Sequence, residues 1–241
     1  MKLEAVVLAA GQGRRLWPLT ESRPKAVLPI GGRPVVATLL RELAAAGIER
    51  VTLVVGRLGE QVEALAGDGS AFGLTVRYAR QPEPLGSADA LRQALEAGAR
   101  APLLACAADT VFRPGDVGSA AARWLVSGTA GGLAVRPVSP NELSERSSVR
   151  VEDGRVLEVV EKPGPGRAPT ALAGAPLWFL GEVLLPFLEG LPGPPFELAV
   201  AFQRAIDARH EVLALEIGPT RDLTRPEDLL RENFPYLLDQ A

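Results

Sequence analysis

The sequence has little of the side-chain chemistry on which many enzymes rely, with one histidine, His210, and one cysteine, Cys106, among 241 residues. A single histidine excludes a metal site built from several histidines, and a single cysteine excludes a disulfide within the chain. Cys106 lies in the apolar segment PLLACAA, where we expect a buried thiol. A chain without a disulfide is expected in the cytoplasm.

Two further shortages exclude whole classes of protein. No apolar run approaches the roughly 18 residues of a membrane-spanning helix, so we expect no membrane partner. The formal net charge is −3 and the pI is near 5.4. The chain therefore lacks the excess of basic residues that is typical of proteins that bind nucleic acid. Hydrophobic residues nevertheless make up 47% of the chain, enough for a substantial core.

Lysine is also scarce, since only Lys2, Lys25 and Lys162 contribute to the 26 lysines and arginines. A lysine retained in a chain that prefers arginine can mark a need for a compact, mobile charge, although chance composition is the alternative. Lys25 and Lys162 both lie in proline-flanked turns, RPKAVLP and EKPG. The ring of Pro163 predicts an extended backbone at Lys162.

The amino terminus carries the most informative pattern. An apolar strand over residues 3–10 leads into the glycine-rich turn 11–13, and Arg14 and Arg15 follow. The free N–H groups of such a turn, with cations behind it, suit a polyphosphate. Leu16 stands where the dinucleotide-binding fingerprint has its third glycine, and the Gly-Lys-Ser/Thr ending of the ATPase loop is missing. The turn therefore indicates a nucleotide site of a third type.

Apolar runs alternate with helical patterns in the first half of the chain. We expect strands at 3–10, 51–55, 74–79 and 102–108, and helices at 34–47, 59–66, 87–98 and 117–127. This alternation predicts parallel strands joined by right-handed crossovers. Ligands bind at the carboxyl ends of such strands, which are followed here by Gly11, Gln81 and Asp109.

The second half has shorter connections. We expect strands at 131–137, 148–152, 155–161, 172–180 and 212–217, helices at 181–190, 196–208 and 226–239, and a loop at 164–169. Turns such as Asp153-Gly154 predict hairpins, so the sheet should be mixed. We predict an α/β fold with three layers around a doubly wound, mixed but mostly parallel, Rossmann-like sheet. It should form one domain, with halves at about 1–130 and 131–241.

Five segments together resemble the sugar-nucleotide pyrophosphorylases, nucleotidyltransferases that make NDP-sugars from an NTP and a sugar 1-phosphate. They are LAAGQGRRLWPLTESRPKAVLPIGGRPVV, GDGSAFGLTVRYARQPEPLGSADAL, AADTVF, VVEKPG and RDLTRPEDLLREN. The resemblance covers residues 3–233 and is to the glucose-1-phosphate thymidylyltransferase type. It implies the Rossmann-like nucleotidyltransferase fold and Mg²⁺-dependent transfer of a nucleotidyl group from dTTP or UTP to a sugar 1-phosphate.

The resemblance also implies roles for individual positions. Nucleotide binding would fall to Leu8, Ala9, Ala10, Gly11, Gly13, Arg14, Arg15, Lys25, Gln81, Leu85, Gly86 and Asp109. The sugar phosphate would be held by Ser148, Glu161, Lys162 and Gly174, Mg²⁺ by Asp109 and Asp222, and catalysis would rest on Arg15, Lys25, Asp109 and Lys162. The Gln81 amide, a donor beside an acceptor, would read the imide edge of thymine or uracil with the N–H of Gly86.

This reaction needs no histidine. The nucleophile is already a phosphate oxygen, so no general base is required, and positioning with charge stabilisation carries the catalysis. Mg²⁺ typically takes one or two carboxylates along with phosphate oxygens and waters, which matches two aspartates far apart in the sequence.

Several alternatives stay open. Asp109 could cap a turn, and Asp222 could pair with a neighbouring arginine on the surface. The enzyme could use CTP or GTP, as a mannose-1-phosphate guanylyltransferase does, or the chain could be a catalytically silent regulatory homologue. Departures from the family pattern at Ala108, Ser147 and Thr220 surround the sugar side, so the sugar is not identified. A homo-oligomer is also left open.

Overall fold

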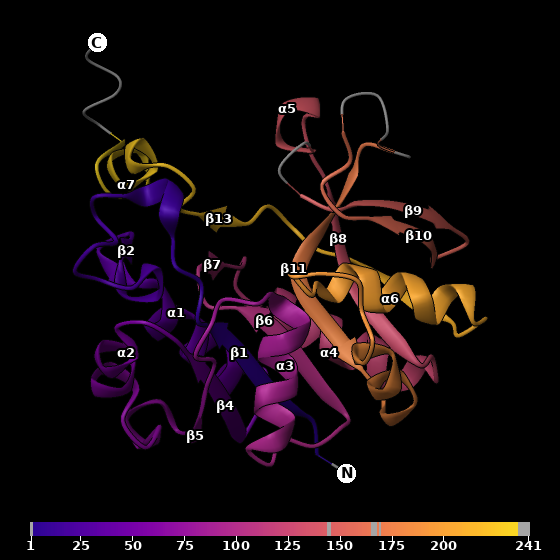
Figure 1. Cartoon of the computed structure of the whole chain (residues 1–241), viewed down its shortest axis with the longest axis horizontal. Coiled ribbons are helices and arrows are strands. Elements are labelled where there is room, and N and C mark those ends of the chain that lie inside the picture. The colour runs from indigo at the N-terminus through magenta and orange to yellow at the C-terminus, as the bar shows by residue number, and fades with distance from the viewer. Residues whose placement is uncertain (1, 144–145, 165–167, 169, 236–241) are drawn as a thin grey trace.

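The computed structural model describes residues 2–143, 146–164, 168 and 170–235 (Figure 1). Its centre is a nine-stranded sheet with the order β5-β4-β1-β6-β11-β8-β12-β10-β9. The strands are β1 (Glu4–Ala9), β4 (Arg50–Val55), β5 (Thr75–Arg80), β6 (Leu103–Ala107), β8 (Gly131–Pro137), β9 (Ser148–Glu152), β10 (Arg155–Val160), β11 (Leu172–Leu180) and β12 (Val212–Glu216). The predicted mixed α/β fold is confirmed.

Seven of the nine strands run in one direction, and β10 and β11 run against them. The four strands of the first half are parallel neighbours, as the alternating pattern predicts. The predicted hairpin joins β9 to β10 through Asp153 and Gly154, which both have a positive φ. Strand β11 comes late in the sequence, yet it lies between β6 and β8 and joins the two halves of the sheet.

Helices pack on both faces of this sheet. One apolar cluster includes α1 (Val35–Ala45), α2 (Gly59–Ala66) and α4 (Asp116–Ser127), and the other includes α3 (Ser87–Glu96) and α6 (Leu198–Asp207). Neighbouring residues of a strand point to opposite faces, so Val7 of β1 joins the first cluster and Val6 joins the second.

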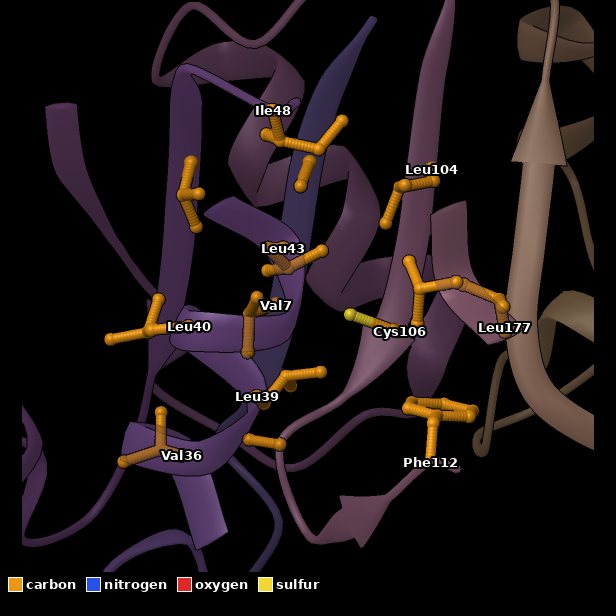
Figure 2. Packing of buried hydrophobic residues seen from close by; sticks show 14 of the residues in the cluster. Val7, Val36, Leu39, Leu40, Leu43, Ile48, Leu104, Cys106, Phe112 and Leu177 are labelled. Carbon is orange, nitrogen blue, oxygen red and sulfur yellow. The ribbon is translucent and has the colours of Figure 1, made fainter. Parts of the chain in front are cut away.

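Figure 2 shows the first cluster, where Leu39, Leu40 and Leu43 of α1 lie over Val7. Cys106 is completely buried in the same cluster, as the sequence predicts. Burial raises the pKa of its thiol to about 12. Cys106 is therefore a packing residue and not a nucleophile.

Two expected helices differ from the structure. The segment expected as a helix at 181–190 is a 3₁₀ helix, η4 (Glu182–Leu188), which contains Pro186 and so lacks one backbone donor. The last helix, α7, spans Pro226–Asn233, and residues 236–239 of its expected range lie outside the described residues. Of the expected loop at 164–169, only residues 164 and 168 are described.

Several short elements were not anticipated from the sequence. They are α5 (Pro140–Leu143), the pairs β2 (Pro29–Ile30) with β3 (Arg33–Pro34) and β7 (Thr110–Val111) with β13 (Arg221–Asp222), and the 3₁₀ helices η1 (Arg14–Leu16), η2 (Lys25–Val27) and η3 (Ser70–Phe72). None of the described helices has the length and apolar character to cross a membrane.

The end of the described chain returns to the amino-terminal half. Figure 1 shows α7 beside β2, on the side of the molecule opposite to β9 and β10. The Asn233 amide donates to the Pro29 carbonyl at 2.8 Å, and the Gly31 N–H donates to the Glu232 carbonyl at 3.2 Å. Because α7 is held there, the preceding strand β13 passes over the carboxyl ends of the central strands.

Candidate functional site

A cavity of about 1030 Å³ lies at the carboxyl ends of β1, β5 and β6, and residues from both halves of the chain line it. The structure brings nearly all of the expected site residues to this one cavity. They are Leu8, Ala9, Ala10, Gly11, Gly13, Arg14, Arg15, Lys25, Gln81, Gly86, Asp109, Glu161, Lys162, Gly174 and Asp222. Leu85 and Ser148 are the two that do not line it.

The glycine turn after β1 forms one wall of the cavity. Gly13 has a φ of 62°, and a Cβ at this position would lie 2.8 Å from the Thr20 methyl carbon. The Thr20 hydroxyl donates to the Gly13 carbonyl at 2.9 Å and holds the turn. The turn therefore requires glycine, and it directs Arg14 and Arg15 of η1 toward the cavity.

A two-residue strand pair brings the two expected metal ligands together. Asp222 of β13 pairs with Thr110 of β7, which is the residue immediately after Asp109. Both aspartates carry a cationic partner: Lys25 Nζ contacts Asp109 Oδ2, and Arg146 Nη2 lies 2.5 Å from Asp222 Oδ2. The Thr224 hydroxyl donates to the other Asp222 oxygen at 3.0 Å.

The charge state of Asp222 follows from these neighbours. Burial raises the pKa of the Asp222 carboxyl. Arg146, the Thr224 hydroxyl and Lys25 lower this pKa by a larger amount, so the pKa of Asp222 lies below its ordinary value. Asp222 is therefore an anion at neutral pH, as a metal ligand must be.

The two aspartates fit Mg²⁺ in their donor chemistry. Mg²⁺ takes oxygen ligands and commonly uses one or two carboxylates, with the remainder from phosphates and waters. Among the described residues no group of three or more histidine, cysteine, aspartate or glutamate side chains could hold a metal. A site made of Asp109 and Asp222 would therefore need oxygens from the substrates to complete it.

Two of the residues expected to hold the sugar phosphate form a charged pair. Glu161 is half-buried, and its Oε1 lies 3.2 Å from Nζ of the exposed Lys162. Burial raises the pKa of Glu161, and the nearby Glu197 carboxylate adds to this, although Lys162 opposes it. The extended backbone expected at Lys162 is wrong, because its φ is 43°. A left-handed conformation is costly in a residue with a Cβ, and functional sites often contain such strain.

Two expected site residues occupy other places. Ser148 is completely buried, and its hydroxyl donates to the Thr170 carbonyl at 3.1 Å. Its neighbour Ser147 lines the cavity instead, because consecutive residues entering a strand face opposite sides. Leu85 does not line the cavity; its carbonyl accepts from the Phe196 N–H at 2.7 Å and so joins the two halves.

Gln81 lines the cavity but presents only part of its amide. Its nitrogen, Nε2, donates to the Gly86 carbonyl at 3.0 Å and to Asp89 Oδ2 at 2.8 Å. Both amide hydrogens are thus occupied, so the expected donor and acceptor pair is reduced to the amide oxygen. The Gly86 N–H donates to no group within the described part of the chain, and a ligand can accept from it.

Some cavity residues were missed from the sequence. Arg146 and Glu197 both line the cavity, the first bonded to Asp222 and the second accepting from the Ser87 hydroxyl at 2.6 Å. Neither lies in a glycine turn or directly after a buried strand, so no local pattern distinguishes them. Trp178 also lines the cavity.

Comparisons with known proteins agree with this geometry. The family described as nucleotidyl transferase matches residues 4–233. A glucose-1-phosphate thymidylyltransferase of Streptomyces griseus is 30% identical over 96% of the chain and 65% of its own length. A CMP-5'-(3-aminopropyl)phosphonate synthase of Streptomyces rubellomurinus is 35% identical over 78% of the chain and 31% of its own length. The chain thus spans about two thirds of the first relative and one third of the second.

Solved structures extend the comparison to the fold. A UDP-glucose pyrophosphorylase in complex with UDP-glucose superposes with a TM-score of 0.87 and covers 99% of this chain and 100% of its own. The two sequences are 22% identical, so this likeness supports the fold alone.

Proposed function

Because the chain belongs to the nucleotidyl transferase family, we propose that it is an enzyme that transfers a nucleotidyl group from an NTP to a sugar 1-phosphate. The observation that carries this proposal is the pairing of β7 with β13. The Asp109 and Asp222 carboxylates, next to this pairing, line one cavity together with the glycine turn, its arginines and Lys162. Two anionic substrates need such an arrangement, since cations must offset their repulsion.

The proposed reaction is a displacement at the α-phosphorus of the NTP. An oxygen of the sugar phosphate forms a bond to that phosphorus, and the bond to the β-phosphate breaks with release of pyrophosphate. Arg15 and Lys25 would hold the leaving pyrophosphate, and Lys162 would hold the attacking phosphate. Mg²⁺ bound by Asp109 and Asp222 would neutralise charge on the α-phosphate. No proton has to move, which agrees with a cavity that no histidine lines.

We propose a pyrimidine imide, uracil or thymine, as the base. The Gln81 amide oxygen would accept the ring N–H, and the Gly86 N–H would donate to a neighbouring carbonyl of the base. Guanine presents two adjacent donors on its edge, and one amide oxygen satisfies only one of them. The thymidylyltransferase among the relatives supports this choice, whereas the CMP-5'-(3-aminopropyl)phosphonate synthase among them marks cytosine as the competitor to test.

We also propose that the chain works as one unit. Strand β11 joins β6 of the first half to β8 of the second, and α7 packs against β2. The nucleotide and sugar sides of the cavity are therefore built by segments that cross between the halves. A single domain best accounts for this exchange.

The direct test measures pyrophosphate release from UTP, dTTP, CTP and GTP with a panel of sugar 1-phosphates and Mg²⁺. We expect turnover with UTP or dTTP to exceed that with the other two. Faster turnover with GTP than with both UTP and dTTP would overturn the base assignment. If no combination releases pyrophosphate from a folded protein, the chain is the silent homologue and the proposed activity is wrong.

Replacing Lys162 with arginine should impair use of the sugar 1-phosphate. A planar guanidinium binds one phosphate bidentately, whereas a compact ammonium fits between two. Lysine and arginine both have a Cβ, so the backbone strain at position 162 is the same in the wild type and in the variant. The substitution therefore changes only the charged end of the side chain. We expect a loss of about 1–3 kcal/mol in transition-state stabilisation, seen in kcat/KM for the sugar 1-phosphate.

The control for this variant is Lys2→Arg, because Lys2 is exposed and its ion pair with Glu49 lies outside the cavity. Its kinetics should equal those of the wild type. Wild-type kinetics in Lys162→Arg would instead remove Lys162 from the phosphate site.

A further inference from the structure

The base end of the cavity contains a buried carboxylate that the proposed chemistry does not use. Asp89 is in the first turn of α3, is only 5% exposed and does not line the cavity. Its Oδ2 accepts from Gln81 Nε2 at 2.8 Å, and Gln81 is itself 5% exposed. A buried charge of this kind needs a polar partner, and the described partner is the amide expected to contact the base.

The two groups around Gln81 Nε2 determine which way its amide faces. The Gly86 carbonyl and the Asp89 carboxylate can only accept hydrogen bonds. If the amide turned over, its oxygen would face two acceptors in a buried place, and both of the Nε2 hydrogen bonds would be lost, although the Gly86 carbonyl would still accept from the Ala90 N–H. The amide is therefore held in one orientation, with its oxygen as the group it can offer to a ligand.

We propose that Asp89 is a positioning residue that makes the site select an imide base, by holding the Gln81 amide with its oxygen toward the ring nitrogen. This inference rests on the proposed function. In uracil and thymine that ring nitrogen carries a hydrogen and donates to the oxygen. In cytosine the same nitrogen is an acceptor, so it would meet another acceptor, and the pair would be repulsive.

A carboxylate at position 89 holds the Gln81 amide in one orientation, whereas an amide at that position would not. An asparagine at position 89 has both a donor and an acceptor, so it could bond to Gln81 in either orientation of the two amides. With Gln81 turned over, its nitrogen would suit the ring nitrogen of cytosine. The first turn of α3 also favours a negative charge through the partial positive charge of the helix N-terminus.

The test compares the wild type with Asp89→Asn, which keeps the shape of the side chain. We expect the ratio of kcat/KM for UTP to that for CTP to fall about tenfold or more. The change should appear mainly in KM for the NTP, with kcat for UTP little altered, because Asp89 acts through Gln81 on the bound base. Glu96→Gln is the matched control, since it removes one charge from an exposed position of the same helix, and it should leave the ratio unchanged.

Equilibrium binding of UMP and CMP without any sugar phosphate separates this inference from the proposed reaction. The wild type should bind UMP more tightly than CMP, and Asp89→Asn should reduce that preference. An unchanged preference in folded Asp89→Asn, or tighter binding of CMP by the wild type, would overturn the inference even if the protein releases pyrophosphate. Should the variant not fold, the wild-type comparison decides alone. A protein that shows the binding preference but no turnover would refute the proposed reaction and leave the positioning role standing.

Discussion

Replacing Asp109 with asparagine is expected to lower kcat/KM about 100-fold or more while the protein stays folded. Asparagine keeps the shape of the side chain but loses the negative charge that would hold Mg²⁺ at the α-phosphate. The carboxylate is partly exposed and its ion pair is with Lys25, so we expect the free energy of unfolding to change by no more than about 1 kcal/mol. Asp222→Asn should lower kcat/KM in the same way, because β13 holds Asp222 beside Asp109.

The measurements for these variants are pyrophosphate release at saturating Mg²⁺ and thermal unfolding. Asp153→Asn is a suitable control, since Asp153 is exposed in the turn between β9 and β10 and asparagine tolerates its positive φ. A variant at Asp109 or Asp222 with near-wild-type turnover at saturating Mg²⁺ would show that the residue is not a metal ligand.

The substitution Gly86→Ala should have the second large effect, on both stability and nucleotide binding. A Cβ at Gly86 would lie 2.3 Å from the Phe196 carbonyl oxygen, and the φ of Gly86 is 109°. The contact is with backbone, which cannot turn away as a flexible side chain does. The segment would have to move, and we expect the free energy of unfolding to fall by about 2–4 kcal/mol.

The same movement would displace the Gly86 N–H and the carbonyl that holds Gln81, so nucleotide affinity should fall as well. The variant Gly115→Ala separates the steric clash of an added Cβ from the backbone strain of a positive φ. Gly115 also has a positive φ, 87°, but its Cβ would meet nothing within 4 Å. Its cost should be limited to the backbone strain of about 1–2 kcal/mol, with nucleotide affinity unchanged. Equal unfolding free energies for the two variants would contradict the predicted clash.

Elements with local signals were predictable from the sequence. The parallel strands β1, β4, β5 and β6 follow from the alternation of apolar runs with helical patterns. A strand that is buried on both faces of a sheet needs several consecutive apolar residues, and such a run is visible in the sequence. The turn containing Gly13 follows from glycine spacing, and its positive φ confirms that a glycine is needed there. The hairpin at Asp153 and Gly154 follows from turn chemistry in the same way.

Other features depend on contacts that no local pattern encodes. The error at Ser148 is a shift of one residue, and it arises because the face that a strand residue occupies depends on its partner strands. The backbone of Lys162 is left-handed although a proline follows it, so the surrounding structure overrides the local preference for an extended backbone. The orientation of Gln81 depends on Asp89, eight residues along the chain on a different element, and the sequence contains no sign of that bond.

The sequence by itself determined the glycine turn, the parallel half of the sheet and the residue types of the site, since each depends on neighbours a few positions apart. The tertiary structure decided where those residues meet. Strand β11 lies between β6 and β8, and α7 docks on β2, which brings β13 over β7. The gathering of Asp109, Asp222 and Lys162 around one cavity therefore results from pairing between distant segments, and that pairing is selected by burial of the whole core.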